Sequence, residues 1–436
     1  MMSLDLPFPD ARRLPRGAPA QARALVEAMT VAEAAVAKGQ PADTALAEFF
    51  RARRHLGSRD RRVISNSVFA AFRWRGWVGS MRDCGPRILA DAVRVESDVP
   101  LPPAVQLLAP EREPPNPPKA GEPSAPSSPP SPLAPAQYRA ERTLGRACPV
   151  RSLLPDWFVE WSLGAGAPDG APPEWMVRFI ESTRVRPPLG LRVLGSAAER
   201  AAALLRAHGY EAWLREDLPG AVQVAGAPPY ENLFRPAGIR AYVQDPASQR
   251  IVSACRAQPG QRWWDACAGG GGKTLGLLDA VGPGGSVWAT DIRPASLRQL
   301  AMRAAALRLP APILDLLDAA SASPSGGPFD GILVDAPCTG SGTWARNPDA
   351  PWRMDLAQAQ ELVHRQQAIL SRASESVRPG GRLVYATCSV VRPENDDQVT
   401  YFLRNHPEFH RDTSESIWPW DGPQNGSYYA ALVRTA

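Results

Sequence analysis

The stretch "RWWDACAGGGGKTLGLL", residues 262–278, decides the fold, because an apolar run leads through four glycines into a helical pattern. Residues 263–266 indicate a buried strand, residues 269–272 a turn, and the residues from Thr274 onward a helix. Glycines in such a turn permit positive φ and a close approach of a ligand, and the helix amino terminus favours a polar or anionic group. The spacing does not fit GxxxxGK[ST], so it excludes a P-loop.

The next strand supplies the second feature of a nucleoside site. It is "GGSVWATDIRP", residues 284–294, and it brings Asp291 to a strand end about twenty residues after the glycines. An acid at that place is positioned to bind ribose hydroxyls. Dinucleotide dehydrogenases and S-adenosylmethionine methyltransferases share this layout, so both remain open at this point.

Two cysteines at strand ends separate these classes. "APILDLLDAA" (311–320) predicts a third strand with Asp318 as its terminal residue, "FDGILVDAPC" (329–338) a fourth, and "GGRLVYATCS" (380–389) a fifth. If the last two strands are parallel neighbours, Cys338 and Cys388 lie over one cleft at the ligand-binding edge of the sheet. A single free cysteine is often a small buried hydrophobe. A pair at adjacent strand ends indicates chemistry, and hydride transfer has no need of two thiols.

Four motifs carry a resemblance to a known family. They are "DACAGGGGKT" (265–274), "DAPCTGSG" (335–342), "RPGGRLVYATCSVVRPEND" (378–396) and "YVQDPASQ" (242–249). The chain from about residue 183 onward resembles the RNA cytosine carbon-5 methyltransferases of the Sun type, in particular their RsmB-like bacterial branch. The resemblance implies an α/β Rossmann-like methyltransferase domain, preceded by a small α+β RNA-binding module and an all-α NusB-like N-terminal domain.

The chemistry of that reaction explains why two thiols are present. Carbon-5 of cytosine is a poor nucleophile, so a thiolate must first add to carbon-6, and covalent catalysis then divides one hard step into easier ones. The resemblance implies that Cys388 is the nucleophile and that Cys338 assists product release. It also places Asp335 against the pyrimidine and the cofactor. Lys273 is expected to favour the thiolate, to cap the loop or to contact RNA.

The resemblance implies S-adenosylmethionine as the cofactor and no metal. The five histidines form no metal-ligand spacing. The residues expected to hold the cofactor are Cys267, Ala268, Gly269, Gly270, Gly271, Gly272, Lys273, Asp291, Asp318 and Asp335.

The front of the chain predicts RNA binding. "FFRARRHLGSRDRRVISNSVFAAFRWRGW", residues 49–77, mixes arginines with aromatic residues. Its part from 51 to 77, with "SRDRRVISNSVFAAFRWRG", is similar to the NusB-like domain of the same branch. Clustered arginines attract phosphates, although a solvated helix face is the alternative. Residues 183–242 follow a strand–helix–strand pattern for which RNA binding and a purely structural role are equally open. The predicted domains are 1–170 with a flexible Pro-rich insertion at about 100–136, 175–242, and 243–436.

Composition sets the remaining expectations. No apolar run is long enough to cross a membrane, the first residues lack a secretory signal, and six scattered cysteines form no CxxC pair. We therefore expect a cytoplasmic monomer that acts on RNA without a membrane. Ribosomal RNA is the expected substrate, tRNA is the alternative, and a catalytically silent RNA-binding assembly factor is the alternative from another class.

Overall fold

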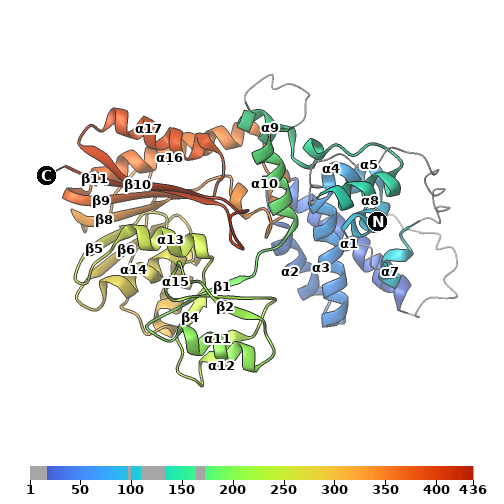
Figure 1. Cartoon of the computed structure of the whole chain (residues 1–436), viewed down its shortest axis with the longest axis horizontal. Coiled ribbons are helices and arrows are strands. Elements are labelled where there is room, and N and C mark those ends of the chain that lie inside the picture. Colours follow the sequence, from blue (N-terminus) through green and yellow to red (C-terminus); the bar gives the residue numbers. More distant parts are fainter. Residues whose placement is uncertain (1–16, 97–99, 110–132, 164–171, 436) are drawn as a thin grey trace. The chain divides into compact units, whose positions relative to one another are not determined.

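The computed structural model describes residues 17–96, 100–109, 133–163 and 172–435. The chain divides into two compact units (Figure 1). The first, here called the helical unit, consists of Met1–Val185 together with Arg346–Leu356. The second, here called the sheet unit, consists of Arg186–Ala345 and Ala357–Ala436.

Every element described in the helical unit is a helix. Helix α3 buries Ile64, Val68 and Phe72, which lie about one turn apart and so form one face. This face packs among α1 and α6. The helices are α1 (Ala18–Val36), α2 (Ala42–Ala52), α3 (Ser58–Arg73), α4 (Arg75–Val78), α5 (Met81–Cys84), α6 (Arg87–Glu96), α7 (Pro103–Gln106), α8 (Ala134–Leu144), α9 (Asp156–Leu163) and α10 (Glu174–Arg184), with 3₁₀ turns η2 (Val150–Leu153) and η4 (Ala350–Trp352).

The start of the Pro-rich stretch is helical, whereas the sequence predicted a flexible insertion at about 100–136. Residues 103–106 form the short helix α7, because Ala104 and Val105 are apolar and find a place in the core beside α1. Helix α8 then begins at Ala134. The rest of the predicted flexible insertion, residues 110–132, lies outside the described residues.

A short segment from the second half of the sequence belongs to the helical unit. The indole nitrogen of Trp352 donates to the carbonyl of Phe72 at 3.0 Å. Asp349 Oδ2 accepts from the backbone N–H of Ala42 at 3.0 Å. No sequence pattern predicted this placement of residues 346–356, since it depends on partners about three hundred positions earlier in the chain.

The first part of the sheet unit is a four-stranded antiparallel sheet with order β2-β3-β1-β4. Helices α11 and α12 pack on it through an apolar cluster that includes Leu191, Leu205, Val222 and Phe234. The elements are β1 (Leu189–Val193), α11 (Ala198–Ala207), β2 (Ala212–Leu214), β3 (Ala221–Val224), α12 (Tyr230–Phe234) and β4 (Ala241–Val243).

The second part is a seven-stranded sheet with order β10-β11-β9-β8-β5-β6-β7. Its strands from β7 to β9 are parallel, and β10 and β11 add antiparallel pairs at one edge. The strands are β5 (Arg262–Asp265), β6 (Ser286–Asp291), β7 (Ile313–Leu316), β8 (Phe329–Asp335), β9 (Val377–Thr387), β10 (Phe409–Ile417) and β11 (Ser427–Arg434). The helices are α13 (Pro246–Cys255), α14 (Gly272–Val281), α15 (Pro294–Ala306), α16 (Leu356–Ser374) and α17 (Asp396–Asn405).

This sheet carries an apolar layer on each face. Trp263 and Trp264 are consecutive on β5 and belong to different clusters, because neighbouring side chains of a strand point to opposite faces. Trp263 lies over Gly331 of β8, where a Cβ would approach its ring to 2.2 Å. Glycine within the apolar run of β8 thus makes room for a buried indole.

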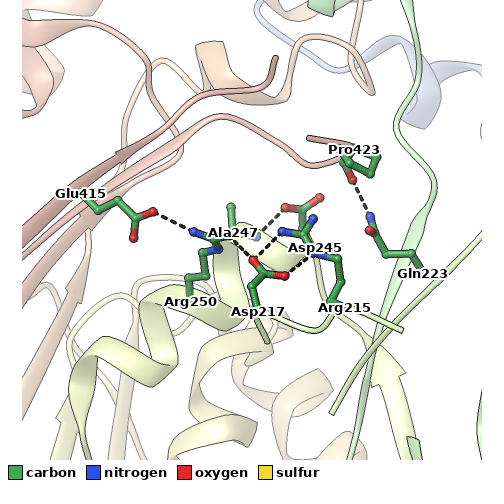
Figure 2. Close-up of polar contacts among 8 residues, drawn as sticks. All are labelled: Arg215, Asp217, Gln223, Asp245, Ala247, Arg250, Glu415 and Pro423. Carbon is green, nitrogen blue, oxygen red and sulfur yellow. Dashed lines mark hydrogen bonds and ion pairs between the residues drawn. The ribbon is translucent and has the colours of Figure 1, made fainter. Parts of the chain in front are cut away.

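Polar contacts join the two sheets of the sheet unit (Figure 2). Arg250 of α13 pairs with Asp217, which lies between β2 and β3, and also with Glu415 of β10, at 2.8 Å. Gln223 of β3 donates to the carbonyl of Pro423, in the loop before β11. These contacts tie the small sheet to the antiparallel edge of the large one.

Candidate active site

The candidate site lies where the strand order reverses, between β5 and β8. The chain leaves the carboxyl end of β5 toward β6 on one side, whereas it leaves the carboxyl end of the neighbouring β8 toward β9 on the other side. Ligands of open α/β sheets bind in the crevice that such a reversal creates. Asp265 ends β5 and Asp335 ends β8 at this edge.

The glycine loop has the backbone geometry that the sequence predicts. Gly269 and Gly271 adopt positive φ of 53° and 82°. At Gly271 a Cβ would also lie 2.3 Å from Leu300 Cδ1, so a side chain there meets both strain and a clash. The loop then passes directly into α14, whose first residue is Gly272.

Asp291 is tied to this loop. Its Oδ2 accepts a hydrogen bond from the backbone N–H of Gly269 at 2.8 Å, and its Oδ1 accepts one from the N–H of Arg293 at 2.8 Å. Burial acts to raise the pKa of Asp291, but these hydrogen bonds and the Arg293 guanidinium outweigh it, and the net shift is downward. An ionised carboxylate therefore stands beside the glycine loop.

Lys273 and Asp335 form a partly buried ion pair. Lys273 Nζ lies 2.6 Å from Asp335 Oδ2, and the Lys273 side chain is 13% exposed. Burial acts to lower the pKa of Lys273, but attraction to Asp335 and the hydrogen bond between them outweigh it and raise the pKa. Lys273 is thus a fixed ammonium at the end of β8. The sequence left three roles open for it, and none of them included this pairing.

The two thiols lie together, as the expected neighbouring strands require. Strands β8 and β9 pair in parallel, and Cys338 Sγ lies 3.3 Å from Cys388 Sγ. The hydrogen bond with Cys388, together with burial, raises the pKa of Cys338 well above its usual value. Cys338 therefore holds its proton more tightly than an ordinary thiol.

Glu394 and Asn395 hold the loops that carry the thiols. The buried Glu394 accepts from the N–H of Thr339 at 2.8 Å and from its hydroxyl at 2.6 Å. Asn395 accepts from the hydroxyl of Thr387 at 2.6 Å and donates to the carbonyl of Ser389 at 3.0 Å, so it brackets Cys388. Sequence reasoning missed both residues, although "RPEND" was among the motifs that carried the resemblance.

The remaining predicted cofactor residues surround the same edge. Ala268 donates its N–H to the carbonyl of Thr290 at 2.9 Å, which ties the loop to the end of β6. Burial raises the pKa of Cys267, which makes it an inert thiol rather than a nucleophile. Asp318, beyond β7, accepts from Arg365 at 2.9 Å and is partly exposed.

Asp265 is a further residue that the sequence did not single out. Its Oδ2 accepts from the Thr274 hydroxyl at 2.7 Å, while its buried Oδ1 has no hydrogen-bond partner in the described part of the chain. Burial raises the pKa of Asp265 to about 7. A buried oxygen without a donor beside the glycine loop fits a ligand that carries hydroxyl or ammonium groups.

Asp265→Asn is expected to flatten the pH dependence of stability between about pH 4 and pH 7. The folded-state pKa of about 7 lies above the ordinary 3.8, so the folded state binds the extra proton and the wild type loses stability as pH rises through this range. The difference corresponds to at most roughly 4 kcal/mol. Urea denaturation at pH 5 and pH 8 measures it. If wild type and Asp265→Asn lose the same free energy of unfolding between pH 5 and pH 8, Asp265 has an ordinary pKa in the folded state.

Comparison with known proteins gives the family. The sequence pattern of the family described as 16S rRNA methyltransferase RsmB/F matches residues 252–430. Ribosomal RNA small subunit methyltransferase B from Klebsiella pneumoniae strain 342 is 33% identical over 295 residues, which cover 65% of this chain and 67% of that protein. The protein of the same name from Salmonella arizonae is 33% identical over 307 residues, with the same coverage. This chain belongs to the RsmB/F family.

Two solved structures confirm the Rossmann-like methyltransferase fold that the sequence predicted. The crystal structure of PH0851 is 21% identical, has a TM-score of 0.71, and covers 95% of this chain and 98% of its own. The crystal structure of NSun6 from Pyrococcus horikoshii with SFG is 18% identical and has a TM-score of 0.52. The match covers 59% of this chain and 94% of that one. As an RsmB/F protein, the chain is an RNA methyltransferase that uses S-adenosylmethionine. None of the helices described here could span a membrane.

Proposed function

We propose that this RsmB/F protein methylates carbon-5 of a cytosine in small-subunit ribosomal RNA through a covalent cysteine adduct. The observation that carries the proposal is the contact of Cys338 and Cys388, 3.3 Å apart, at the strand ends beside the Lys273–Asp335 pair. The names of the relatives support ribosomal RNA as the substrate. The site geometry alone favours no particular RNA.

The residues at the sheet edge fit S-adenosylmethionine. This cofactor supplies an electrophilic methyl group when bound. Backbone groups of residues 269–272, the ionised carboxylate of Asp291 and the unpartnered oxygen of Asp265 would hold it. Asp318 lies just beyond the end of β7, and we expect it to contact the adenosine portion.

Cys388 performs the attack. Its thiolate adds to carbon-6 of the cytosine, a sulfur–carbon bond forms, and the displaced electron pair makes carbon-5 nucleophilic. We expect the positive charge of Lys273, at the end of β8, to favour the thiolate. We expect Asp335 to hydrogen-bond the pyrimidine ring nitrogen or amine. A proton shared between this carboxyl group and the ring nitrogen would make carbon-6 more electrophilic.

Cys338 acts in product release. After carbon-5 has gained its methyl group, its proton must leave and the sulfur–carbon bond must break, which returns the thiolate to Cys388. Cys338 is in contact with Cys388, and its raised pKa makes its thiolate a strong base. After Cys338 has released its own proton to solvent, it accepts the proton from carbon-5. Glu394 keeps the Cys338 loop in place through Thr339.

Asp291→Ala is expected to weaken S-adenosylmethionine binding by roughly 1.5–3 kcal/mol, the value of hydrogen bonds to a charged group. The variant also frees the N–H of Gly269, which Asp291 now holds. Isothermal titration measures the affinity. Arg293→Ala is the matched control, because Arg293 pairs with Asp291 and is itself mostly exposed. If Asp291→Ala and wild type bind S-adenosylmethionine with equal affinity, the ribose is held at another strand end.

Methyl transfer to defined RNA tests the proposed function. Unmodified 16S rRNA and a tRNA pool are incubated with the protein and labelled cofactor, and the modified base is identified by mass spectrometry of nucleosides. The proposal expects 5-methylcytosine in 16S rRNA. Label in tRNA alone would support the tRNA alternative, and a methyl group on another atom would overturn the carbon-5 chemistry.

The arginine cluster divides into engaged and free members. Four of its arginines make internal contacts: Arg53, Arg61, Arg73 and Arg75. Four others are exposed and form no ion pair with any described carboxylate: Arg51, Arg54, Arg59 and Arg62. We propose the second group as the RNA contacts, because charges already paired inside the protein contribute little to phosphate binding.

Replacing the four free arginines with Gln is expected to weaken RNA binding and flatten its salt dependence. Each lost phosphate contact lowers the slope of log K against log salt by roughly 0.7–0.9. Filter binding at several salt concentrations measures this. The matched control replaces Arg53 and Arg75, whose partners are Glu27 and Glu33, and should leave the slope unchanged.

An unchanged slope in the fourfold variant would remove RNA binding from this surface. Deleting the front of the chain is a poorer test, because residues 346–356 would lose partners such as Ala42 and Phe72. A loss of activity after that deletion would therefore mix binding with stability.

A further inference from the structure

A cavity of about 750 Å³ lies in the sheet unit, lined by residues other than the thiols and the glycine loop. Its walls come from α12, β4, the turn between them and the end of α15. Tyr230, Phe234 and Tyr242 supply aromatic rings, and the first two meet edge to face with centroids 5.9 Å apart. A cavity of this volume is large enough for a nucleotide.

The cavity is positively charged. Glu231 is the acid that lines it, and its carboxylate accepts a hydrogen bond from the Tyr230 hydroxyl at 3.2 Å. None of the four lining arginines forms an ion pair with a carboxylate in the described part of the chain. A concave surface with uncompensated charge attracts anions. The four are Arg235, Arg240, Arg303 and Arg308.

Arg308 occupies a backbone position that favours glycine. Its φ is 53°, and it follows the last residues of α15, where its N–H donates to the carbonyl of Ala305 at 3.0 Å. Helices commonly end in this left-handed conformation, and glycine is the usual residue there because it avoids strain. Arg308 therefore has a strained backbone conformation, and its side chain lines the cavity.

We propose that this cavity binds one nucleotide of the RNA substrate, with its phosphate on Arg235 and Arg308 and its base against the ring of Tyr230. Guanidinium groups match phosphate geometry through paired N–H donors. Unpaired RNA bases stack on aromatic side chains. The proposal rests on the proposed function only in taking RNA as the substrate.

Arg303 connects this nucleotide site with the cofactor loop. Its Nη1 donates to the carbonyl of Gly270 at 2.5 Å, and its guanidinium carbon lies 5.5 Å from the Tyr242 ring centroid. The same side chain therefore lines the cavity and touches the glycine loop. For this reason Arg303 is unsuitable as a test position, because its loss would affect both sites.

The test uses the full-length double variant Arg235→Ala/Arg308→Gly and, separately, Tyr230→Leu. Binding of an unmodified 16S rRNA transcript is measured at several salt concentrations. We expect affinity to fall about tenfold in the double variant, as for lost hydrogen bonds to charged groups, and the salt slope to fall by about 0.7 per contact. Tyr230→Leu should lower affinity without changing the slope.

Three controls test whether the variants keep their fold, their cofactor site and their other RNA contacts. Arg308→Gly alone should keep or raise the melting temperature, because glycine suits the left-handed backbone. S-adenosylmethionine affinity should stay at the wild-type value in all variants. Arg200→Ala removes an exposed arginine of α11 that does not line the cavity, so it should change neither affinity nor slope.

Cross-linking locates the nucleotide directly. A transcript that contains 4-thiouridine is irradiated with the wild-type protein, and the cross-linked peptides are mapped. Cross-links at Tyr230 or Tyr242 support the proposal, and cross-links only outside the cavity overturn it. Binding of uridine monophosphate is measured as well, to distinguish a site for a free nucleotide from a site for the RNA. If the variants no longer bind uridine monophosphate but bind RNA like wild type, the proposal is overturned.

Failure of this proposal and failure of the proposed function are distinguishable. If wild type methylates the transcript while the double variant keeps wild-type affinity and slope, the cavity proposal fails and the function stands. If wild type methylates no cytosine, the function fails, but a loss of RNA affinity in the double variant still supports the cavity site.

Discussion

Cys388→Ala is expected to abolish turnover and every covalent complex with RNA, whereas Cys338→Ala should still attack its substrate and release it slowly. The physical reason is the state of the thiol pair. Cys338 keeps its proton because its contact with Cys388 and its burial raise its pKa. We propose Cys388, the other member of the pair, as the nucleophile. Without Cys388 no sulfur–carbon bond forms. Without Cys338 the bond forms but its breakage is slowed.

Denaturing gel electrophoresis with labelled RNA reads both outcomes. A denaturation-resistant adduct should accumulate with Cys338→Ala and be absent with Cys388→Ala and with the double variant. Cys84→Ala is the matched control, since Cys84 is an exposed thiol of the helical unit and should keep wild-type turnover. An adduct with Cys388→Ala but none with Cys338→Ala would reverse the two roles.

Asp335→Asn is expected to lower kcat by roughly 10²- to 10⁴-fold, the range of a lost contact to the reacting group. It should also destabilise the fold. Lys273 Nζ lies 2.6 Å from Asp335, and breaking this partly buried pair should cost less than the roughly 3–5 kcal/mol of a fully buried one. Single-turnover kinetics and chemical denaturation measure the two effects separately.

A second substitution separates stability from catalysis. In Asp335→Asn/Lys273→Met both charges are gone, so much of the lost stability should return while turnover stays low. Asp330→Asn, at the other end of β8, breaks a pair with Arg378 and should leave kcat unchanged. Full recovery of turnover in the double variant would mean that Asp335 serves only to neutralise Lys273.

Short-range patterns were sufficient for the strands and loops that build the site. The glycine run after Trp264 and the acid at Asp291 each depend on residues close together in the chain, where apolar runs and turn residues are reliable signals. The expectation that the strands before Cys338 and Cys388 are parallel neighbours was confirmed. The functional roles of the site residues and the domain boundaries stay predictions.

The sequence by itself determined the strands that lead to the glycine loop, to Asp291 and to the two thiols, and through its motifs the Rossmann-like methyltransferase fold and the family. It missed the exact end of β7, at Leu316 rather than Asp318, and the strands β10 and β11. The tertiary structure alone decided which of those residues meet. Lys273 and Asp335 are 62 positions apart, Thr339 and Glu394 are 55 apart, and residues 346–356 joined the helical unit. Local periodicity reports burial and the direction of a side chain, whereas such contacts depend on strand order and loop paths, which no local pattern encodes.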